Sequence, residues 1–333
     1  MSVGAQRPRR LLVAPDSFKG TFSAPEVAAA IGAGIADAGG EADLCPVADG
    51  GEGTAEALRV ALGGERLRVP AHDPLGREIE AELVLLDDGA TAALDTAAAS
   101  GLPLLDPDER DAEAASTAGT GELIAAALAA GAGRVLVAAG GSATTDGGRG
   151  AIEALRERGG TGTARLEVLC DVTTRFEDAA RVFAPQKGAD EAAVARLTAR
   201  LREYAGELPR DPRGVPMTGC AGGLSGSLWA AFGAELRPGA DFVLGLVDFE
   251  WRLTAADAAV SGEGRIDSQS LEGKAVGRIA AICARRGRDL HVLVGRDALD
   301  RAAVGDLPIC SIREAGTLAA LRAAGATIAR GAS

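Results

Sequence analysis

Histidine, aromatic residues and long apolar runs are scarce in this sequence, and each shortage excludes a class of protein. Only His72 and His291 are present, which argues against a histidine-based zinc site and against a serine–histidine–aspartate triad. Aromatic residues make up 3% of the chain, so a base-stacking surface for nucleic acid is not expected. No apolar run approaches the ~20 residues that a membrane-spanning helix needs.

Positive charge and paired cysteines are also in short supply. The formal net charge of −12 argues against nucleic acid or an anionic membrane as the main partner. The five cysteines are scattered, with no C-x-x-C pair, which is typical of reduced thiols in a cytosolic protein. The stretch from Met1 to Arg10 is polar and basic and lacks the apolar core of a signal peptide. We therefore expect a cytoplasmic protein, monomeric or homodimeric, that binds neither nucleic acid nor membrane.

Among the features that are present, the glycine-rich segment 140–148 is the most informative. It follows the apolar run 135–139, which is typical of a buried strand, and it precedes a helix-like segment. Such a turn exposes backbone N–H groups and the positive end of a helix dipole, which suits anions. The hydroxyls of Ser142 and Thr144 add donors, whereas Asp146 would repel a bare phosphate. Donors and a carboxylate together fit a phosphate that a divalent metal accompanies, as Mg²⁺ accompanies ATP.

Two regions of alternating strand and helix patterns flank a longer central region. Residues 1–65 supply two strands of parallel type and residues 255–333 supply three, which together predict one doubly wound parallel sheet. We therefore predict a two-domain α/β protein, in which a second α/β domain of mixed sheet (66–254) interrupts the first. The expected strands are 10–15, 42–47, 66–69, 78–86, 91–96, 135–139, 166–172, 258–261, 291–294 and 308–312; the expected helices are 23–39, 55–62, 121–130, 149–158, 191–204, 221–231 and 274–286.

Four glycine loops in the chain also carry carboxylates, and three of them come just after a predicted strand. They are residues 16–20, 49–54, 140–148 and 262–267. A single loop of this kind is more often a tight turn, but a set of four that each joins glycine to carboxylates predicts a ligand site. The nucleotide motifs with a fixed spacing are absent, since Gly273-Lys274 is not a Walker A sequence and 262–267 lacks the third glycine of a dinucleotide fingerprint.

These segments, taken in order along the chain, resemble the type I glycerate kinases. That family phosphorylates D-glycerate with ATP, usually at the 2-hydroxyl. The matching segments are Ala14-Pro-Asp-Ser-Phe-Lys-Gly20, Ala48-Asp-Gly-Gly-Glu-Gly-Thr54, Ala98-Ala-Ser-Gly-Leu102, Gly119-Thr-Gly-Glu-Leu123, Gly140 to Gly148, Pro185-Gln-Lys-Gly-Ala189, Ala221-Gly-Gly223, and Ser261 to Gln269 with Gly273-Lys274. The resemblance implies a flavodoxin-like domain interrupted by a second α/β domain. It also implies ATP and Mg²⁺ as cofactors, and D-glycerate or a similar small hydroxy acid as substrate.

The resemblance also suggests roles for individual residues. Asp171, Asp146 and Lys19 are the expected catalytic residues, and Asp146 or Asp171 would carry Mg²⁺ or act as the base. Lys19 would bind either the transferred phosphate or the glycerate carboxylate. The expected substrate-binding residues are Asp16, Ser17, Asp49, Gly50, Gly51, Glu52 and Asp267, of which Asp49 and Glu52 are also candidate metal ligands; the expected ATP-binding residues are Gly140, Gly141, Ser142, Thr144, Lys187 and Lys274.

Two alternatives remain open from the sequence. The segment 174–178 departs from the family pattern, where an Asn-Pro-Leu stretch is usual, and this suggests a kinase for a related small hydroxy acid. A non-catalytic regulator that binds a nucleotide or an acid would have the same fold. The carboxylates in all four loops favour the enzyme, because a protein that only binds its ligand has less need of metal-binding carboxylates.

Overall fold

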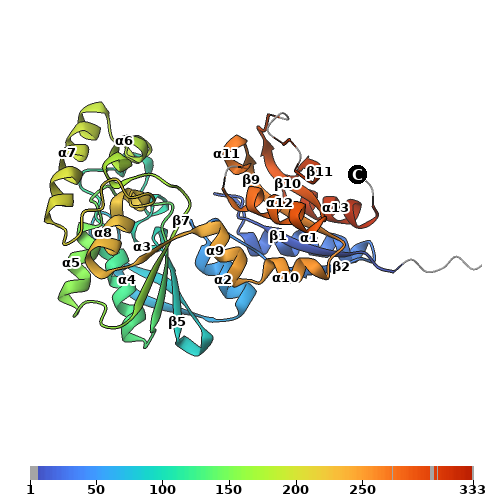
Figure 1. The fold of residues 1–333 in the computed structure, drawn as a ribbon, viewed down its shortest axis with the longest axis horizontal. Coiled ribbons are helices and arrows are strands. Elements are labelled where there is room, and N and C mark those ends of the chain that lie inside the picture. The colour runs from blue at the N-terminus through green and yellow to red at the C-terminus, as the bar shows by residue number, and fades with distance from the viewer. Residues whose placement is uncertain (1–6, 272, 301–303, 306, 332–333) are drawn as a thin grey trace, which may run out of the picture. The chain divides into compact units, whose positions relative to one another are not determined.

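The structure is a computed structural model that describes residues 7–271, 273–300, 304–305 and 307–331. Residues 1–6, at the start of the basic N-terminal stretch, lie outside that description. The chain divides into two compact units, unit 1 (Met1–Asp49 with Val243–Ser333) and unit 2 (Gly50–Phe242). Each unit is built around its own sheet (Figure 1). None of the helices in the described ranges is long and apolar enough to cross a membrane.

Unit 1 contains a five-stranded parallel sheet in the order β11-β10-β9-β1-β2. Two of its strands come from the N-terminal segment and three from the C-terminal segment, as the sequence predicts. Counted within the unit, the order is 2-1-3-4-5, which is the flavodoxin-like order. The prediction of a doubly wound parallel sheet is therefore confirmed. The strands are β1 Arg10–Pro15, β2 Glu41–Leu44, β9 Ala258–Ile266, β10 Asp289–Asp297 and β11 Ile309–Glu314; the helices are α1 Ala24–Asp37, α10 Phe249–Thr254, α11 Ser268–Leu271, α12 Ala275–Arg286 and α13 Leu318–Ala329.

The first helix of unit 1 shows why this sequence folds as it does. Ser23 and Glu26 form a capping box that satisfies backbone donors at the start of α1. Val27, Ile31 and Ile35 then recur every four residues, so they lie on one face of α1 and are fully buried. That face packs against α13 and joins the core of the sheet. The apolar stripe thus fixes which side of the helix meets the strands.

Unit 2 contains a six-stranded sheet in the order β3-β4-β5-β6-β7-β8. Strands β3, β4 and β5 pair antiparallel, and β5 to β8 pair parallel, so the prediction of a mixed sheet is confirmed. The strands are β3 Glu65–His72, β4 Glu78–Leu86, β5 Thr91–Asp95, β6 Arg134–Ala138, β7 Arg165–Cys170 and β8 Glu235–Pro238; the helices are α2 Thr54–Leu62, α3 Ala97–Ser100, α4 Ala118–Ala129, α5 Arg149–Glu157, α6 Ala179–Phe183, α7 Glu191–Glu207 and α8 Leu224–Phe232. Helix α9 (Gly239–Leu246) contains the residues on either side of the second unit boundary.

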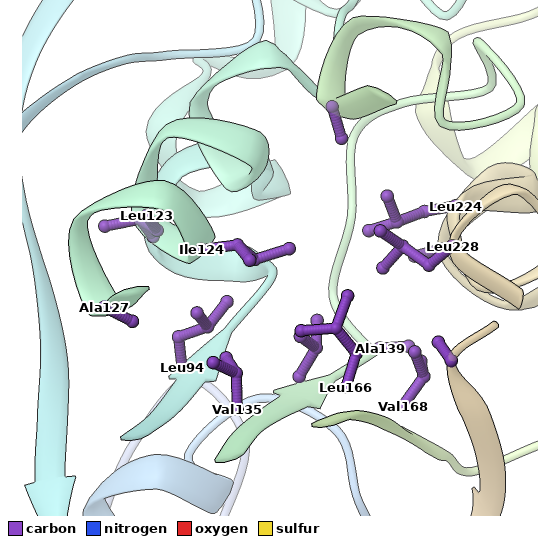
Figure 2. Close-up of a cluster of buried hydrophobic side chains, with 14 of the residues drawn as sticks. Leu94, Leu123, Ile124, Ala127, Val135, Ala139, Leu166, Val168, Leu224 and Leu228 are labelled. Atoms are coloured by element: carbon purple, nitrogen blue, oxygen red, sulfur yellow. The ribbon is translucent and has the colours of Figure 1, made fainter. Parts of the chain in front are cut away.

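The core of unit 2 lies between this sheet and helices α4 and α8. Figure 2 shows Leu123 and Ile124 of α4 above Leu94 and Val135 of the strands, with Leu228 of α8 farther along the sheet. All five side chains are at most 1% exposed. Burial of these side chains stabilises the packing of α4 and α8 on the sheet, at roughly 25 cal/mol for each Å² of apolar surface removed from water.

Two sequence-based limits differ from the structure. Helix α2 belongs to unit 2 because it packs on β4 and β5, so unit 2 begins at Gly50 rather than at residue 66. Unit 2 ends at Phe242 rather than at residue 254. The glycine loop predicted at 262–267 is a strand as far as Ile266, because β9 continues to pair with β10 beyond Ser261. The discontinuous division into domains remains our proposal, with these limits replacing 1–65, 66–254 and 255–333.

Candidate active site

Unit 1 holds a cavity of about 510 Å³ beside the carboxyl ends of β1 and β9. These two strands are neighbours, and the chain leaves them in opposite directions across the sheet, which makes this the topological switch point where ligands of such folds bind. Four carboxylates line the cavity (Asp16, Asp49, Glu263 and Asp267), as do four cations (Lys19, Arg265, Lys274 and Arg296). The structure thus brings together all the site residues predicted in this unit.

Asp16 and Asp49 lie deep in this cavity. Asp16 follows β1 directly, is 6% exposed, and accepts a hydrogen bond from the Ser17 amide at 2.6 Å. Burial, together with the charge of Asp49, raises the pKa of Asp16 well above its usual range. The Lys19 ammonium lies 3.8 Å from the Asp49 carboxylate, and its side chain is 56% exposed against 4% for Asp49. The carboxylates are therefore at the base of the cavity and this cation is at its rim.

Glu263 and Lys274 complete the side of the cavity that β9 and α12 form. Burial raises the pKa of Glu263 to about 7, and the buried Oε1 atom has no hydrogen-bond partner among the described residues. Lys274 is the N-cap residue of α12, and its side chain makes no capping hydrogen bond there. A buried polar atom without a partner is uncommon in a folded protein, so a polar group of a ligand is the expected partner for Glu263.

In unit 2, two glycine loops meet backbone to backbone. A Cβ atom on Gly140 would lie 2.5 Å from the Gly51 Cα, and one on Gly141 would lie 3.1 Å from the Glu52 Oε2. Gly50 has a φ of +94°, and a Cβ there would lie 2.7 Å from the Gly239 Cα. A Cβ at Gly140 or Gly50 would meet backbone atoms that cannot move aside, and the positive φ of Gly50 and of Gly141 (+69°) also favours glycine. The loops after β2 and β6 therefore lie together at the carboxyl edge of the parallel strands.

Lys187 supports the 140–148 loop from inside the protein. It is 2% exposed, and its Nζ donates to the Ser142 Oγ at 3.1 Å and to the Thr144 carbonyl at 2.5 Å. Burial lowers the pKa of Lys187 to about 7, while the negative charge of Asp146 opposes this shift. Both hydrogen-bond partners are neutral groups of the loop. The structure thus joins Lys187 to two of the predicted phosphate-binding residues.

Asp146 is engaged on both carboxylate oxygens. Its Oδ2 accepts hydrogen bonds from the Thr117 amide at 2.9 Å, the Thr117 hydroxyl at 2.8 Å and the Gly150 amide at 3.1 Å. Its Oδ1 accepts from the Gly148 amide at 2.9 Å. These donors lie at the starts of α4 and α5, where backbone N–H groups have no partner within the helix. Asp146 therefore caps two helices.

Asp95 and Asp171 lie at the carboxyl ends of β5 and β7, the two strands on either side of β6. Asp171 is half-buried directly after β7, next along the sheet from the strand that carries the 140–148 loop. Asp95 ends β5 and accepts hydrogen bonds from the amides of Gly53 at 2.8 Å and Ala55 at 3.0 Å. Burial raises the pKa of Asp95 to about 6. Asp95 thus contacts the end of the 49–54 loop, and Asp171 follows the strand next to the one that carries the 140–148 loop.

Three residues at these sites escaped sequence reasoning. Arg265 and Arg296 line the cavity of unit 1 together, because β9 and β10 pair them in register. Asp95 holds the start of α2, where Gly53 offers no capping side chain. The sequence signal that could have found Asp95 was a carboxylate at the end of a predicted strand.

Comparison with known proteins identifies the family. The profile of the Glycerate kinase family matches residues 11–161 and 158–320. The chain belongs to the glycerate kinase family. It is 37% identical over 302 residues to "Glycerate 2-kinase" of Escherichia coli (strain K12), covering 80% of this chain and 79% of that one. It is 40% identical over 305 residues to "Glycerate kinase" of Bacillus subtilis (strain 168), with coverage of 80% and 79%.

A solved glycerate kinase fold superposes on nearly the whole chain. The crystal structure of a Salmonella typhimurium LT2 protein assigned as glycerate kinase 2 has a TM-score of 0.83 and 32% sequence identity. The match covers 97% of this chain and 98% of that one. The resemblance inferred from the motifs is therefore confirmed, and with it the prediction of an enzyme that is a kinase.

Proposed function

We propose that this protein transfers the γ-phosphoryl group of ATP to D-glycerate and that the product is 2-phosphoglycerate. The observation that carries the proposal is the cavity of unit 1, where buried carboxylates lie beneath exposed cations. A hydroxy acid offers both groups that such a cavity would bind, hydroxyls for the carboxylates and a carboxylate for the cations. The relative named Glycerate 2-kinase supports the choice of hydroxyl.

The acid, in this proposal, binds in the cavity of unit 1. Asp16 and Asp49 would accept hydrogen bonds from its hydroxyls, and Lys19 would hold its carboxylate. Lys274 lines the same cavity, so we assign it to the acid rather than to the phosphates of ATP. Asp267 lines the cavity as well and would orient the acid. Positioning of this kind contributes to rate by replacing a chance encounter with a fixed geometry.

The phosphates of ATP, in this proposal, bind to the 140–148 loop of unit 2. The backbone amides from Gly140 to Ser142 would donate to phosphate oxygens, and Gly50 and Gly51 would keep the neighbouring loop close enough to exclude water. Lys187 would hold the loop through Ser142 and Thr144 and place a positive charge beneath it. Charge neutralisation and alignment are the main needs of phosphoryl transfer.

Mg²⁺ fits this site as a companion of ATP rather than as a metal held by the protein alone. The described residues contain no group of three histidine, cysteine or acidic side chains that could hold a metal ion. A magnesium ion bound with nucleotide needs only one or two carboxylates, because phosphates and waters fill its other positions. Asp171 would supply one of these carboxylates. The bound ion would neutralise phosphate charge.

The sequence alone does not distinguish the roles of Asp146 and Asp171. We propose a different role for each. Both oxygens of Asp146 accept hydrogen bonds at helix starts, so this residue positions the phosphate loop. Asp171 would then either hold Mg²⁺ or accept the proton of the glycerate hydroxyl. The free thiols of all five cysteines support placing this reaction in the cytoplasm.

The test is incubation of the full chain with ATP, Mg²⁺ and D-glycerate, with ADP release measured and the product identified by NMR. We expect stoichiometric ADP and 2-phosphoglycerate. Formation of 3-phosphoglycerate would overturn the choice of hydroxyl, and turnover with another hydroxy acid alone would overturn the choice of substrate. If no acid gives ADP although ATP and glycerate raise the melting temperature, the protein is a binding regulator.

A further inference from the structure

Two arginines in unit 1 lie opposite each other on neighbouring strands. Arg265 of β9 and Arg296 of β10 are register partners in the parallel pair, and both line the 510 Å³ cavity. Both side chains are exposed. Neither makes an ion pair or a side-chain hydrogen bond with any residue that the structure describes.

Several other arginines on the strands of this protein have carboxylate partners. Arg68 of β3 pairs with Glu82 at 2.7 Å, and Arg134 of β6 pairs with Glu167 at 2.6 Å. Like charges on directly paired strand positions repel each other. The Arg265–Arg296 pair therefore has an electrostatic cost. For Arg68 and Arg134 a neighbouring carboxylate offsets the positive charge, and for Arg265 and Arg296 an anionic ligand would do so.

Two glycines next to these arginines allow the turn that carries Lys19 to pack closely on the strands. A Cβ on Gly264 would lie 3.2 Å from the Lys19 backbone N, and one on Gly295 would lie 3.5 Å from the Cδ2 atom of Phe18 in the same turn. The turn that carries Lys19 thus lies directly on the two strands that carry the arginines. The ammonium of Lys19 and the two guanidinium groups consequently belong to one cavity.

We propose that Arg265 and Arg296 are the pair that recognises the carboxylate of the hydroxy acid and selects acids over neutral polyols. This inference rests on the function proposed above. Guanidinium groups bind carboxylates through parallel hydrogen bonds, which gives direction as well as charge. Glu263 lies two residues before Arg265 on the same strand and therefore faces the same side of the sheet. Its Oε1, which has no hydrogen-bond partner in the described ranges, would meet a hydroxyl of the same ligand.

The experiment uses the variants Arg265→Gln, Arg296→Gln and the double variant of the full chain. Steady-state kinetics would give kcat and KM for D-glycerate and KM for ATP. We expect KM for glycerate to rise by about 10- to 100-fold in each single variant, since a hydrogen bond to a charged group is lost. We expect KM for ATP to stay within about twofold. Arg285→Gln is the matched control, because this exposed arginine of α12 pairs with Glu250 and does not line the cavity.

Selectivity gives a second readout that a structural role would not change. Glycerol keeps the hydroxyls of glycerate but lacks its carboxylate, so the ratio of kcat/KM for glycerate over glycerol should fall in the variants. Arg265→Lys and Arg296→Lys keep the charge and should restore part of the affinity. An unchanged KM for glycerate would overturn the inference, as would a rise confined to KM for ATP.

The change in melting temperature on ligand binding tests the arginine pair even if the protein has no kinase activity. If the wild-type chain phosphorylates no acid, the proposed function fails, and glycerate and glycerol are compared as ligands instead. Stabilisation by glycerate that exceeds that by glycerol, and that the double variant loses, would still support the arginine pair. Equal stabilisation of wild type and double variant by glycerate would overturn it.

Discussion

The two units place glycine-rich turns after parallel strands, yet they hold charge in opposite ways. In unit 1, the carboxylates of Asp16 and Asp49 are buried and Lys19 is exposed. In unit 2, Lys187 is buried against neutral groups, and Asp146 is covered by backbone amides. The first arrangement leaves acceptors and cations available to a small ligand. The second fixes the shape of a loop whose amides then serve as donors.

One physical cause acts with opposite sign in the two units. Burial disfavours the charged form of any group, so it raises the pKa of Glu263 to about 7 and lowers the pKa of Lys187 to about 7. Both groups are consequently close to half-charged near neutral pH. Burial is therefore the largest influence on the pKa of one group in each unit, Glu263 in the cavity of unit 1 and Lys187 beneath the 140–148 loop of unit 2.

The largest expected effect tests Asp171, the carboxylate that directly follows β7 in unit 2. Asp171→Asn should lower kcat by about 10²- to 10⁴-fold, the range that a positioned acid or base contributes. Its melting temperature should stay within a degree of wild type. Asp211→Asn is the control, because this exposed carboxylate of unit 2 pairs with the exposed Arg213. Turnover near that of wild type would remove Asp171 from the catalytic residues.

The close backbone contacts of the two units give a second, paired prediction. A Cβ on Gly140 would lie 2.5 Å from the Gly51 Cα, and one on Gly262 would lie 2.1 Å from the Leu293 carbonyl oxygen. Each change to alanine should lower the free energy of unfolding by about 1–3 kcal/mol through overpacking. Urea titration followed by circular dichroism would measure it.

Function should separate these two glycine variants. We expect Gly140→Ala to raise KM for ATP and Gly262→Ala to raise KM for glycerate, since each displaces the binding groups of its own unit. Gly133→Ala and Gly245→Ala are matched controls, because a Cβ at either position meets nothing within 4 Å. If both variants changed the same KM, the assignment of one ligand to each unit would be wrong.

Asp146→Asn is expected to act on stability more than on chemistry. An asparagine side chain has one acceptor oxygen and would turn donors toward the amides of Gly148 and Gly150, which are donors themselves. A loss of about 1–3 kcal/mol in the free energy of unfolding should follow. Hydrogen exchange should speed up at the starts of α4 and α5. Loss of activity with no change in stability or exchange would return Asp146 to the metal ligands.

Much of the fold could be predicted because its signals are local. The apolar run of β1, the capping box of α1 and the glycine turns are each read within about ten residues. The count of two strands before and three after the central region follows from such patterns and predicts one doubly wound parallel sheet, whereas the flavodoxin-like order is what the family resemblance implies. The unit boundary at Gly50 could not be predicted, because it depends on which sheet α2 packs against.

The parts of the site that the sequence missed depend on pairing across long separations. The helix caps made by Asp146 need Thr117, which lies 29 residues earlier, and a backbone amide leaves no trace in a sequence. Arg265 and Arg296 become neighbours only through the register of β9 and β10. The motifs thus predicted which residues lie at a site. The role of each residue depends on its hydrogen-bond and strand partners, which the motifs do not contain.

The smallest expected effect is a pH dependence that belongs to unit 1. Burial raises the pKa of Glu263 from 4.5 to about 7, so between these values the folded protein binds more protons than the unfolded chain. Stability from this group is therefore fully present below about pH 4.5 and is lost as pH rises through about 7. Glu263→Gln lacks the ionisation, so its melting temperature should rise relative to wild type as pH goes from 5 to 7.5.

The difference should reach a few degrees, which corresponds to roughly 1–2 kcal/mol after allowance for solvent in the cavity. Asp16 keeps part of the pH dependence in the variant, because the pKa of Asp16 is also raised. Glu250→Gln is the control, since this exposed carboxylate on α10 forms ion pairs with Arg285 and Arg286 and does not line the cavity. A constant difference for Glu263→Gln would mean that water reaches this carboxyl group freely. The charge contrast between the two units would then rest on Asp16 and Lys187 alone.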